Sequence, residues 1–116
     1  MGSSFTESYV KMSVVLKEIK KWGLYYVDSR TTTRTVAYDA AKKIGVPTAK
    51  KSLFLDNDLE KTAIAYQMER LLSIARYSGS AVGIGHPHHE TLEVLNNYKG
   101  KLEKGFRVVP VSSLVN

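Results

Sequence analysis

Helical and strand-like segments alternate along the whole chain, and this order restricts the possible folds more than any other feature of the sequence. Apolar residues recur at helical spacing in four segments, residues 4–22, 36–44, 59–77 and 91–102. A short run rich in apolar and β-branched residues follows each of them, at residues 24–27, 53–55, 81–86 and 106–111. Alternation of this kind is typical of parallel strands with helices packed outside the sheet. The sequence therefore predicts an α/β fold, with parallel strands that form part of a (β/α) barrel or sheet.

Residues at the segment boundaries indicate where helices begin and end. Ser4 and Glu7 have the spacing of a capping box, which predicts a helix start at Ser4. Asp58 is placed to cap the third helix, and Pro110 favours an edge position for the last strand. Three of the helical segments are followed by a glycine, namely Gly23, Gly45 and Gly79.

Two features predict that further strands precede this chain in a larger domain. The chain opens on a helical segment without a strand before it. Four parallel strands also leave a sheet edge open, and native sheets normally pair or cover such an edge. We therefore expect residues 1–116 to be the C-terminal portion of an α/β domain, and we expect the chain to self-associate or to pair with a missing N-terminal half.

Composition excludes several classes of site. The 116 residues contain no cysteine, which excludes thiolate zinc sites and cysteine nucleophiles. The net charge is +6, but the lysines occur in pairs near predicted helix ends, where they complement the helix dipole. Because a nucleic-acid surface more often shows a clustered basic stripe with aromatics, we expect no nucleic-acid partner. No apolar run approaches the ~18 residues that a membrane span requires, so we expect no span.

Polar side chains follow three of the predicted strands, at residues 28–30, 56–58 and 86–89. Because parallel strands point the same way, these three groups are expected at one rim of the sheet, where ligands bind in open α/β sheets. His86 follows the run Ala81–Gly85, and Pro87 prevents the strand from continuing. Its imidazole suits either general acid chemistry or metal binding.

The other polar residues of this rim allow more than one interpretation. Asp28 suits a general base, a metal ligand, the orienting partner of a histidine, or an Asx turn that closes the strand. Arg30 suits a partner for Asp28 or for an anionic group. Asp56 is compatible with a site role, and His86 and His88 are the possible metal ligands within a cluster that continues to His89.

Several of these segments resemble the divergent polysaccharide deacetylase family. The resemblance is carried in order by Met1–Thr6, Tyr26–Thr32, Phe54–Asn57, Ile84–Pro87 and Val108–Ser112. It implies a distorted (β/α) barrel, a protein of the cell envelope or the cell exterior, and hydrolysis of the N- or O-acetyl groups of a carbohydrate by a metal-activated water. The expected metal is zinc. A non-catalytic carbohydrate-binding or interaction domain on the same fold is the alternative.

The resemblance also implies roles for individual residues. His86 matches the histidine that protonates the leaving group, and Asp28 belongs with it to the catalytic residues. Ser29, Arg30 and Asp56 match positions that line the substrate pocket. One departure is Ser4, where the family usually has a basic residue. A larger one is that family members carry about as much chain again before this point, with an Ile-Asp-Asp motif and a histidine that supply the base and metal ligands. We therefore expect this chain alone to be inactive.

Overall fold

The computed structural model describes residues 3–116, which fall into two compact units. Unit 1 contains the described residues up to Lys51 together with Val111–Asn116, and unit 2 is Ser52–Pro110. Met1 and Gly2, which open the Met-Gly-Ser run of the family resemblance, lie outside the described residues. Each unit combines a pair of short parallel strands with helices, so the predicted mixed α/β class is confirmed.

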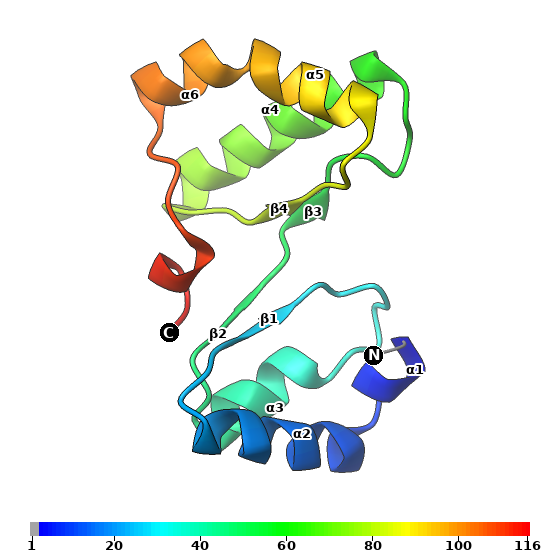
Figure 1. Cartoon of the computed structure of the whole chain (residues 1–116), viewed down its shortest axis with the longest axis vertical. Helices are drawn as coiled ribbons and strands as arrows, with labels where there is room; N and C mark the ends of the chain where they lie inside the picture. Colours follow the sequence, from blue (N-terminus) through cyan, green and yellow to red (C-terminus); the bar gives the residue numbers. More distant parts are fainter. Residues whose placement is uncertain (1–2) are drawn as a thin grey trace. The chain divides into compact units, whose positions relative to one another are not determined.

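Unit 1 is built around the parallel strands β1 (Tyr26–Asp28) and β2 (Thr48–Lys50). Tyr26 lies opposite Thr48, and Asp28 lies opposite Lys50. The helices α2 (Tyr9–Lys21) and α3 (Ala37–Ile44) cover the same side of this strand pair (Figure 1). The short helix α1 (Ser3–Thr6) precedes α2, and a 3-10 helix forms at Val111–Ser113.

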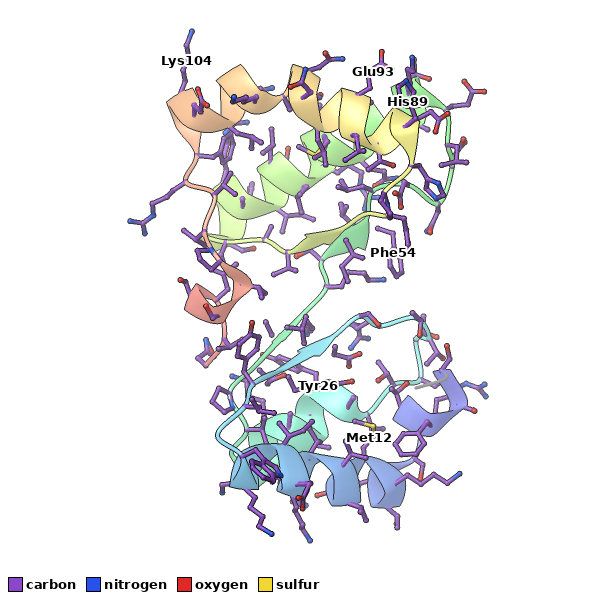
Figure 2. The ribbon with its side chains drawn as sticks, in the orientation of Figure 1. Met12, Tyr26, Phe54, His89, Glu93 and Lys104 are labelled. Atoms are coloured by element: carbon purple, nitrogen blue, oxygen red, sulfur yellow. The ribbon has the colours of Figure 1, made fainter. Side chains whose placement is uncertain are left out.

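The core of unit 1 is a close contact between α2 and α3. Met12 and Leu16, two of the apolar positions that the helical spacing predicts, are fully buried against alanines of α3 (Figure 2 labels Met12). Alanine side chains are small, so they let the two helices approach closely. The buried cluster consists of Met12, Leu16, Ala37, Ala40, Ala41 and Val46.

Unit 2 has the same plan, with β3 (Leu53–Phe54) parallel to β4 (Gly83–Ile84). The long helix α4 (Lys61–Ser78) connects the two strands, and α5 (His89–Asn97) and α6 (Lys99–Gly105) follow β4. All three helices lie on one side of the strand pair (Figure 1). Its buried cluster consists of Leu53, Leu55, Ile64, Met68 and Val94.

Two glycines of the predicted 81–86 strand make room for side chains from the helices of unit 2. A Cβ atom on Gly83 would lie 2.7 Å from Leu71 Cδ2, which is closer than the two carbons can approach. A Cβ on Gly85 would lie 3.2 Å from Thr91 Cγ2 and 3.6 Å from Asp56 Oδ2. Glycine at these two positions therefore lets β4 and the residues after it pack against α4 and α5.

Several sequence-based predictions for strands need correction. Residues 106–111 do not form the predicted last strand: Phe106–Pro110 has no ladder partner in the described chain, and the 3-10 helix begins at Val111. Strand β2 was not predicted, although it pairs along its whole length with β1. The four strands form two separate two-stranded ladders, so a full barrel is not seen within residues 3–116.

Two helix starts also differ from the prediction. The first helical segment breaks after Thr6, and Ser8 is the N-cap of α2, accepting a hydrogen bond from the Lys11 amide at 3.3 Å. Ser4 therefore does not form the predicted capping box. Asp58 is not the cap of α4, because the N-cap of that helix is Glu60. The Asp58 carboxylate instead accepts a hydrogen bond from the Glu60 N–H at 2.9 Å. No helix in residues 3–116 is long and apolar enough to span a bilayer.

Candidate functional site

In unit 2 the structure joins two of the predicted site residues, Asp56 and His86. Each lies two residues beyond a strand, and Leu55 extends the ladder by donating its N–H to the Ile84 carbonyl at 2.8 Å. The Nδ1 atom of His86 lies 2.8 Å from Asp56 Oδ1, and the His86 backbone N–H donates to Asp56 Oδ2 at 2.6 Å. The two residues therefore form a carboxylate–imidazole pair, which we call the Asp56–His86 dyad.

Thr91, which was not among the predicted site residues, is a third member of this cluster. Its hydroxyl donates to Asp56 Oδ2 at 2.8 Å, and the residue is almost completely buried in α5. Thr91 begins the predicted helical segment 91–102, and nothing in its sequence context marks it as a partner of a strand-end carboxylate. Both oxygens of Asp56 are thus occupied by donors that hold the carboxylate in one orientation.

The dyad has one buried and one exposed member. The Asp56 side chain is inaccessible to solvent, whereas the His86 side chain is 55% exposed. Burial raises the pKa of the Asp56 carboxyl, but the hydrogen bonds from the His86 ring, the His86 amide and Thr91 outweigh burial, so that the pKa is lowered overall. Asp56 is therefore ionised at neutral pH and presents a fixed negative charge to the imidazole.

The position of the His86 ring leaves its second nitrogen available. With Nδ1 facing the carboxylate, Nε2 is the ring nitrogen that has no hydrogen-bond partner among residues 3–116. The Phe54 ring stacks on the imidazole, with 6.3 Å between centroids and 23° between planes. The carboxylate and the stacked ring hold an exposed imidazole in place, which is an arrangement suited to proton transfer at Nε2.

Asp56, His86 and His88 also form the group of possible metal ligands in the described chain. One donor atom from each lies within 4.8 Å of the others. The number of donors suits catalytic zinc, which takes three protein ligands. However, Asp56 Oδ1 and His86 Nδ1 already bond to each other at 2.8 Å, and coordination through both atoms would break that hydrogen bond. These residues therefore fit a proton-transfer dyad better than a three-ligand metal site.

The third histidine of the sequence cluster is not part of this group. His89 begins α5, and its Nε2 lies 3.5 Å from Glu93 Oε2 one turn along the helix (Figure 2). Its side chain is exposed. His89 is thus a surface residue of the helix rather than a neighbour of Asp56.

Asp28 occupies a different environment, in unit 1. It is buried at the end of β1. Its Oδ2 accepts hydrogen bonds from the Thr35 hydroxyl and the Tyr38 N–H, both at 3.1 Å, and its Oδ1 accepts the Arg30 N–H at 2.9 Å. Because Tyr38 lies in the first turn of α3, the carboxylate satisfies an amide at a helix N-terminus, where negative charge is favourable. These contacts show Asp28 holding the start of α3 and the loop before it.

The loop that follows Asp28 carries the other two predicted site residues, Ser29 and Arg30. Both are half-buried. Arg30 adopts a left-handed backbone conformation with φ 48°, and its carbonyl oxygen accepts a hydrogen bond from Lys51 Nζ at 3.1 Å. Sequence reasoning missed Lys51, although the Lys50-Lys51 pair directly after the apolar residue Ala49 was a usable signal.

A family model identifies the family of this chain, and three uncharacterized proteins are similar to it. The chain matches the model of the family described as divergent polysaccharide deacetylase over residues 1–115, which confirms the family predicted from the motifs. The uncharacterized protein YibQ of Escherichia coli is 36% identical over 100% of this chain, which covers 36% of YibQ. An uncharacterized protein of Haemophilus influenzae is 32% identical over 98% of this chain, which covers 41% of that relative.

A solved structure shows the same fold. The crystal structure of an uncharacterized protein from Agrobacterium tumefaciens matches 99% of this chain with a TM-score of 0.93 and 25% identity, and the match covers 47% of that protein. The chain thus spans less than half the length of these relatives.

Proposed function

Because the chain belongs to the divergent polysaccharide deacetylase family, we propose that it provides the proton-donating part of a metal-dependent carbohydrate deacetylase. The substrate is a carbohydrate of the cell envelope that carries N- or O-acetyl groups. One observation carries this proposal: the buried carboxylate of Asp56 lies 2.8 Å from Nδ1 of an exposed histidine.

In the proposed reaction, water adds to the acetyl carbonyl carbon and the bond to the sugar nitrogen or oxygen breaks. Acetate leaves on one side and a free amine or hydroxyl on the other. The departing atom needs a proton, and His86 Nε2 is placed to supply it when the imidazole is protonated. The sugar-side product then leaves uncharged at the moment of bond cleavage, which lowers the barrier.

Asp56 acts through His86 in this proposal. Its ionised carboxylate accepts the Nδ1 hydrogen, which fixes the tautomer and directs Nε2 outwards. The same negative charge faces the ring that donates the proton. Thr91 and the His86 amide keep the carboxylate in place and ionised.

The remaining predicted residues receive subsidiary roles in this proposal, including Asp28, which the family resemblance places among the catalytic residues. We assign substrate contacts to Ser29 and Arg30, and we assign Asp28 the positioning of their loop, because both of its oxygens are used by that loop and by α3. When bound, the metal would polarise the acetyl carbonyl and activate water. We assign its ligands and the general base to the part of the longer relatives that this chain does not cover.

Acetate release from acetylated oligosaccharides tests this proposal, using the longer protein with zinc added or chelated. His86→Ala is expected to lower turnover by about 10²–10⁴-fold, the usual contribution of a general acid. His89→Ala is the matched control, because that histidine is exposed and does not touch Asp56. Equal loss in both variants, or none in His86→Ala, would contradict the assignment.

Two further outcomes separate this proposal from its alternatives. Oligosaccharide binding without acetate release would favour the carbohydrate-binding domain. Zinc-dependent turnover by residues 1–116 alone, abolished by His86→Ala, would show that the metal ligands lie within this chain after all.

A further inference from the structure

Arg30 has a backbone conformation that L-amino acids with a long side chain rarely adopt. Its φ angle is 48°, and among residues 3–116 the other positive φ values belong to glycines. A non-glycine residue in the left-handed region is less stable there than glycine. Strain of this kind tends to be kept where the side chain has a function. The sequence therefore retains an arginine at a position where glycine would fit the backbone better.

Arg30 is also the start of a small cationic cluster. Lys51, directly after β2, donates a hydrogen bond from its Nζ to the Arg30 carbonyl oxygen at 3.1 Å. Both residues are half-buried. Burial lowers the pKa of Lys51 most and the Arg30 charge lowers it further, while the Asp28 charge acts in the opposite direction. Two cations are thus held near one another at the carboxyl ends of two parallel strands, which is the edge where α/β sheets bind ligands.

The nearby carboxylate does not neutralise the guanidinium. Asp28 accepts its hydrogen bonds from two backbone amides and the Thr35 hydroxyl. The Arg30 guanidinium takes part in none of the hydrogen bonds and ion pairs found among residues 3–116, and the Glu7 carboxylate of unit 1 pairs with Arg34. The cluster therefore has a positive charge that suits an anionic ligand.

We propose that Arg30 and Lys51 form a binding site for the anionic group of an acidic sugar, a carboxylate or a phosphate. The planar guanidinium can bind either oxyanion through two parallel hydrogen bonds, and the ammonium adds a second charge. The conclusion that the substrate is an acidic rather than a neutral polysaccharide rests on the proposed function. The conclusion that Arg30 and Lys51 bind an anionic group rests on the geometry of unit 1 alone.

A titration of residues 1–116 followed by amide NMR tests the site with three ligands: glucuronate, glucose 6-phosphate and glucose. We expect at least one anionic sugar to bind about tenfold or more tightly than glucose, to shift the Arg30 and Lys51 amides, and to bind more weakly as salt is added. The stronger of the two anionic sugars identifies the group as carboxylate or phosphate. Equal binding of all three sugars would overturn the proposal.

Two variants separate a ligand role from a structural one. Arg30→Gly removes the cation and relieves the backbone, so it should keep or raise the melting temperature and lose the preference for the anionic sugar. Lys51→Met should also lose that preference, whereas Lys50→Met, at the exposed neighbouring lysine over the Tyr38 ring, should keep it. Retained preference in both Arg30→Gly and Lys51→Met would overturn the site. The longer protein could still release acetate from neutral oligosaccharides in that case. The anion site and the proposed deacetylase function can therefore be refuted independently of each other.

Discussion

Replacing Asp56 by asparagine tests the physical basis of the dyad. The carboxylate accepts one hydrogen bond through Oδ1 and two through Oδ2, and it does so without contact with solvent. Asparagine has nearly the same shape but only one acceptor oxygen and no charge. If its oxygen receives the His86 amide and Thr91, its NH₂ group faces His86 Nδ1. The imidazole must then become the acceptor at Nδ1 and carry its hydrogen on Nε2.

The expected loss of stability follows from these contacts. A hydrogen bond to a charged group contributes about 1.5–3 kcal/mol, and a neutral one about 1 kcal/mol. Weakening two bonds and reversing the third therefore lowers the free energy of unfolding of unit 2 by about 2–4 kcal/mol at neutral pH. Asp58→Asn is the control, because Asp58 is exposed and asparagine can keep its hydrogen bond to the Glu60 amide. We expect it to change stability by no more than about 0.5 kcal/mol.

The pH dependence of this difference has a defined sign. The folded chain lowers the pKa of Asp56, so its contribution is fully present above the usual aspartate pKa of about 3.9 and is lost as the pH falls through the folded value. The difference between wild type and Asp56→Asn should therefore shrink as the pH falls below the usual aspartate pKa.

Urea denaturation followed by amide NMR is the suitable assay. The single tryptophan, Trp22, belongs to unit 1 and does not report on unit 2. The resonances of Gly83 and Thr91 report on the strand and helix that surround the dyad. A difference below about 1 kcal/mol at pH 7, or one that does not change between pH 7 and pH 3, would refute an ionised, hydrogen-bonded Asp56.

Three further predictions concern the packing of each unit. Asp28→Ala removes the acceptor of three hydrogen bonds at the start of α3 and should destabilise unit 1 by about 2–4 kcal/mol, measured by tryptophan fluorescence during urea denaturation; an unchanged midpoint would contradict this. Gly83→Ala places a Cβ 2.7 Å from Leu71 Cδ2 and should cost about 1–3 kcal/mol. Gly100→Ala is the control, because a Cβ on Gly100 would have no atom within 4 Å. Since Gly100 lies in α6, we expect this substitution to raise the free energy of unfolding by up to about 1 kcal/mol. Burial and a hydrogen bond to a glutamate raise the pKa of Tyr98 to about 12, so its phenol should still be protonated at pH 11 in an NMR titration.

Local sequence signals located the helices of this fold, although two of the helix starts differ from the prediction. Helical spacing located the buried residues of α2, α3 and α4, and two glycines in the left-handed conformation end α3 and α4 at the predicted positions, Gly45 and Gly79. These signals work because the helix hydrogen bonds and caps involve residues close in sequence.

The short strands were harder to predict, because their hydrogen bonds depend on distant residues. Thr48–Lys50 contains an alanine and follows a proline, and it becomes a strand because β1 lies beside it. Thr48 also forms two backbone hydrogen bonds with Asn116: the Thr48 N–H donates to the Asn116 carbonyl at 3.1 Å, and the Asn116 N–H donates to the Thr48 carbonyl at 3.2 Å. The Val108-Val109 pair has higher β-propensity but no strand beside it among the described residues, so it remains irregular.

In the candidate site, too, some contacts could be predicted from the sequence and others depend on residues that are distant in the chain. Asp56 and His86 could be brought together from the sequence, since each follows a strand and parallel strands end at one edge. Thr91 could not, because it reaches Asp56 from a helix face that the sequence does not pair with that carboxylate.

The tautomer of His86 is the most direct test of the central claim that a buried carboxylate orients an exposed imidazole for proton donation. It can be measured by long-range ¹H–¹⁵N NMR of the imidazole in residues 1–116, at a pH where the ring is neutral, with Asp56→Asn as the comparison. The dyad predicts hydrogen on Nδ1 and a free Nε2 in the wild type, and hydrogen on Nε2 in the variant. Hydrogen on Nε2 in the wild type, or the same tautomer in both chains, would contradict it.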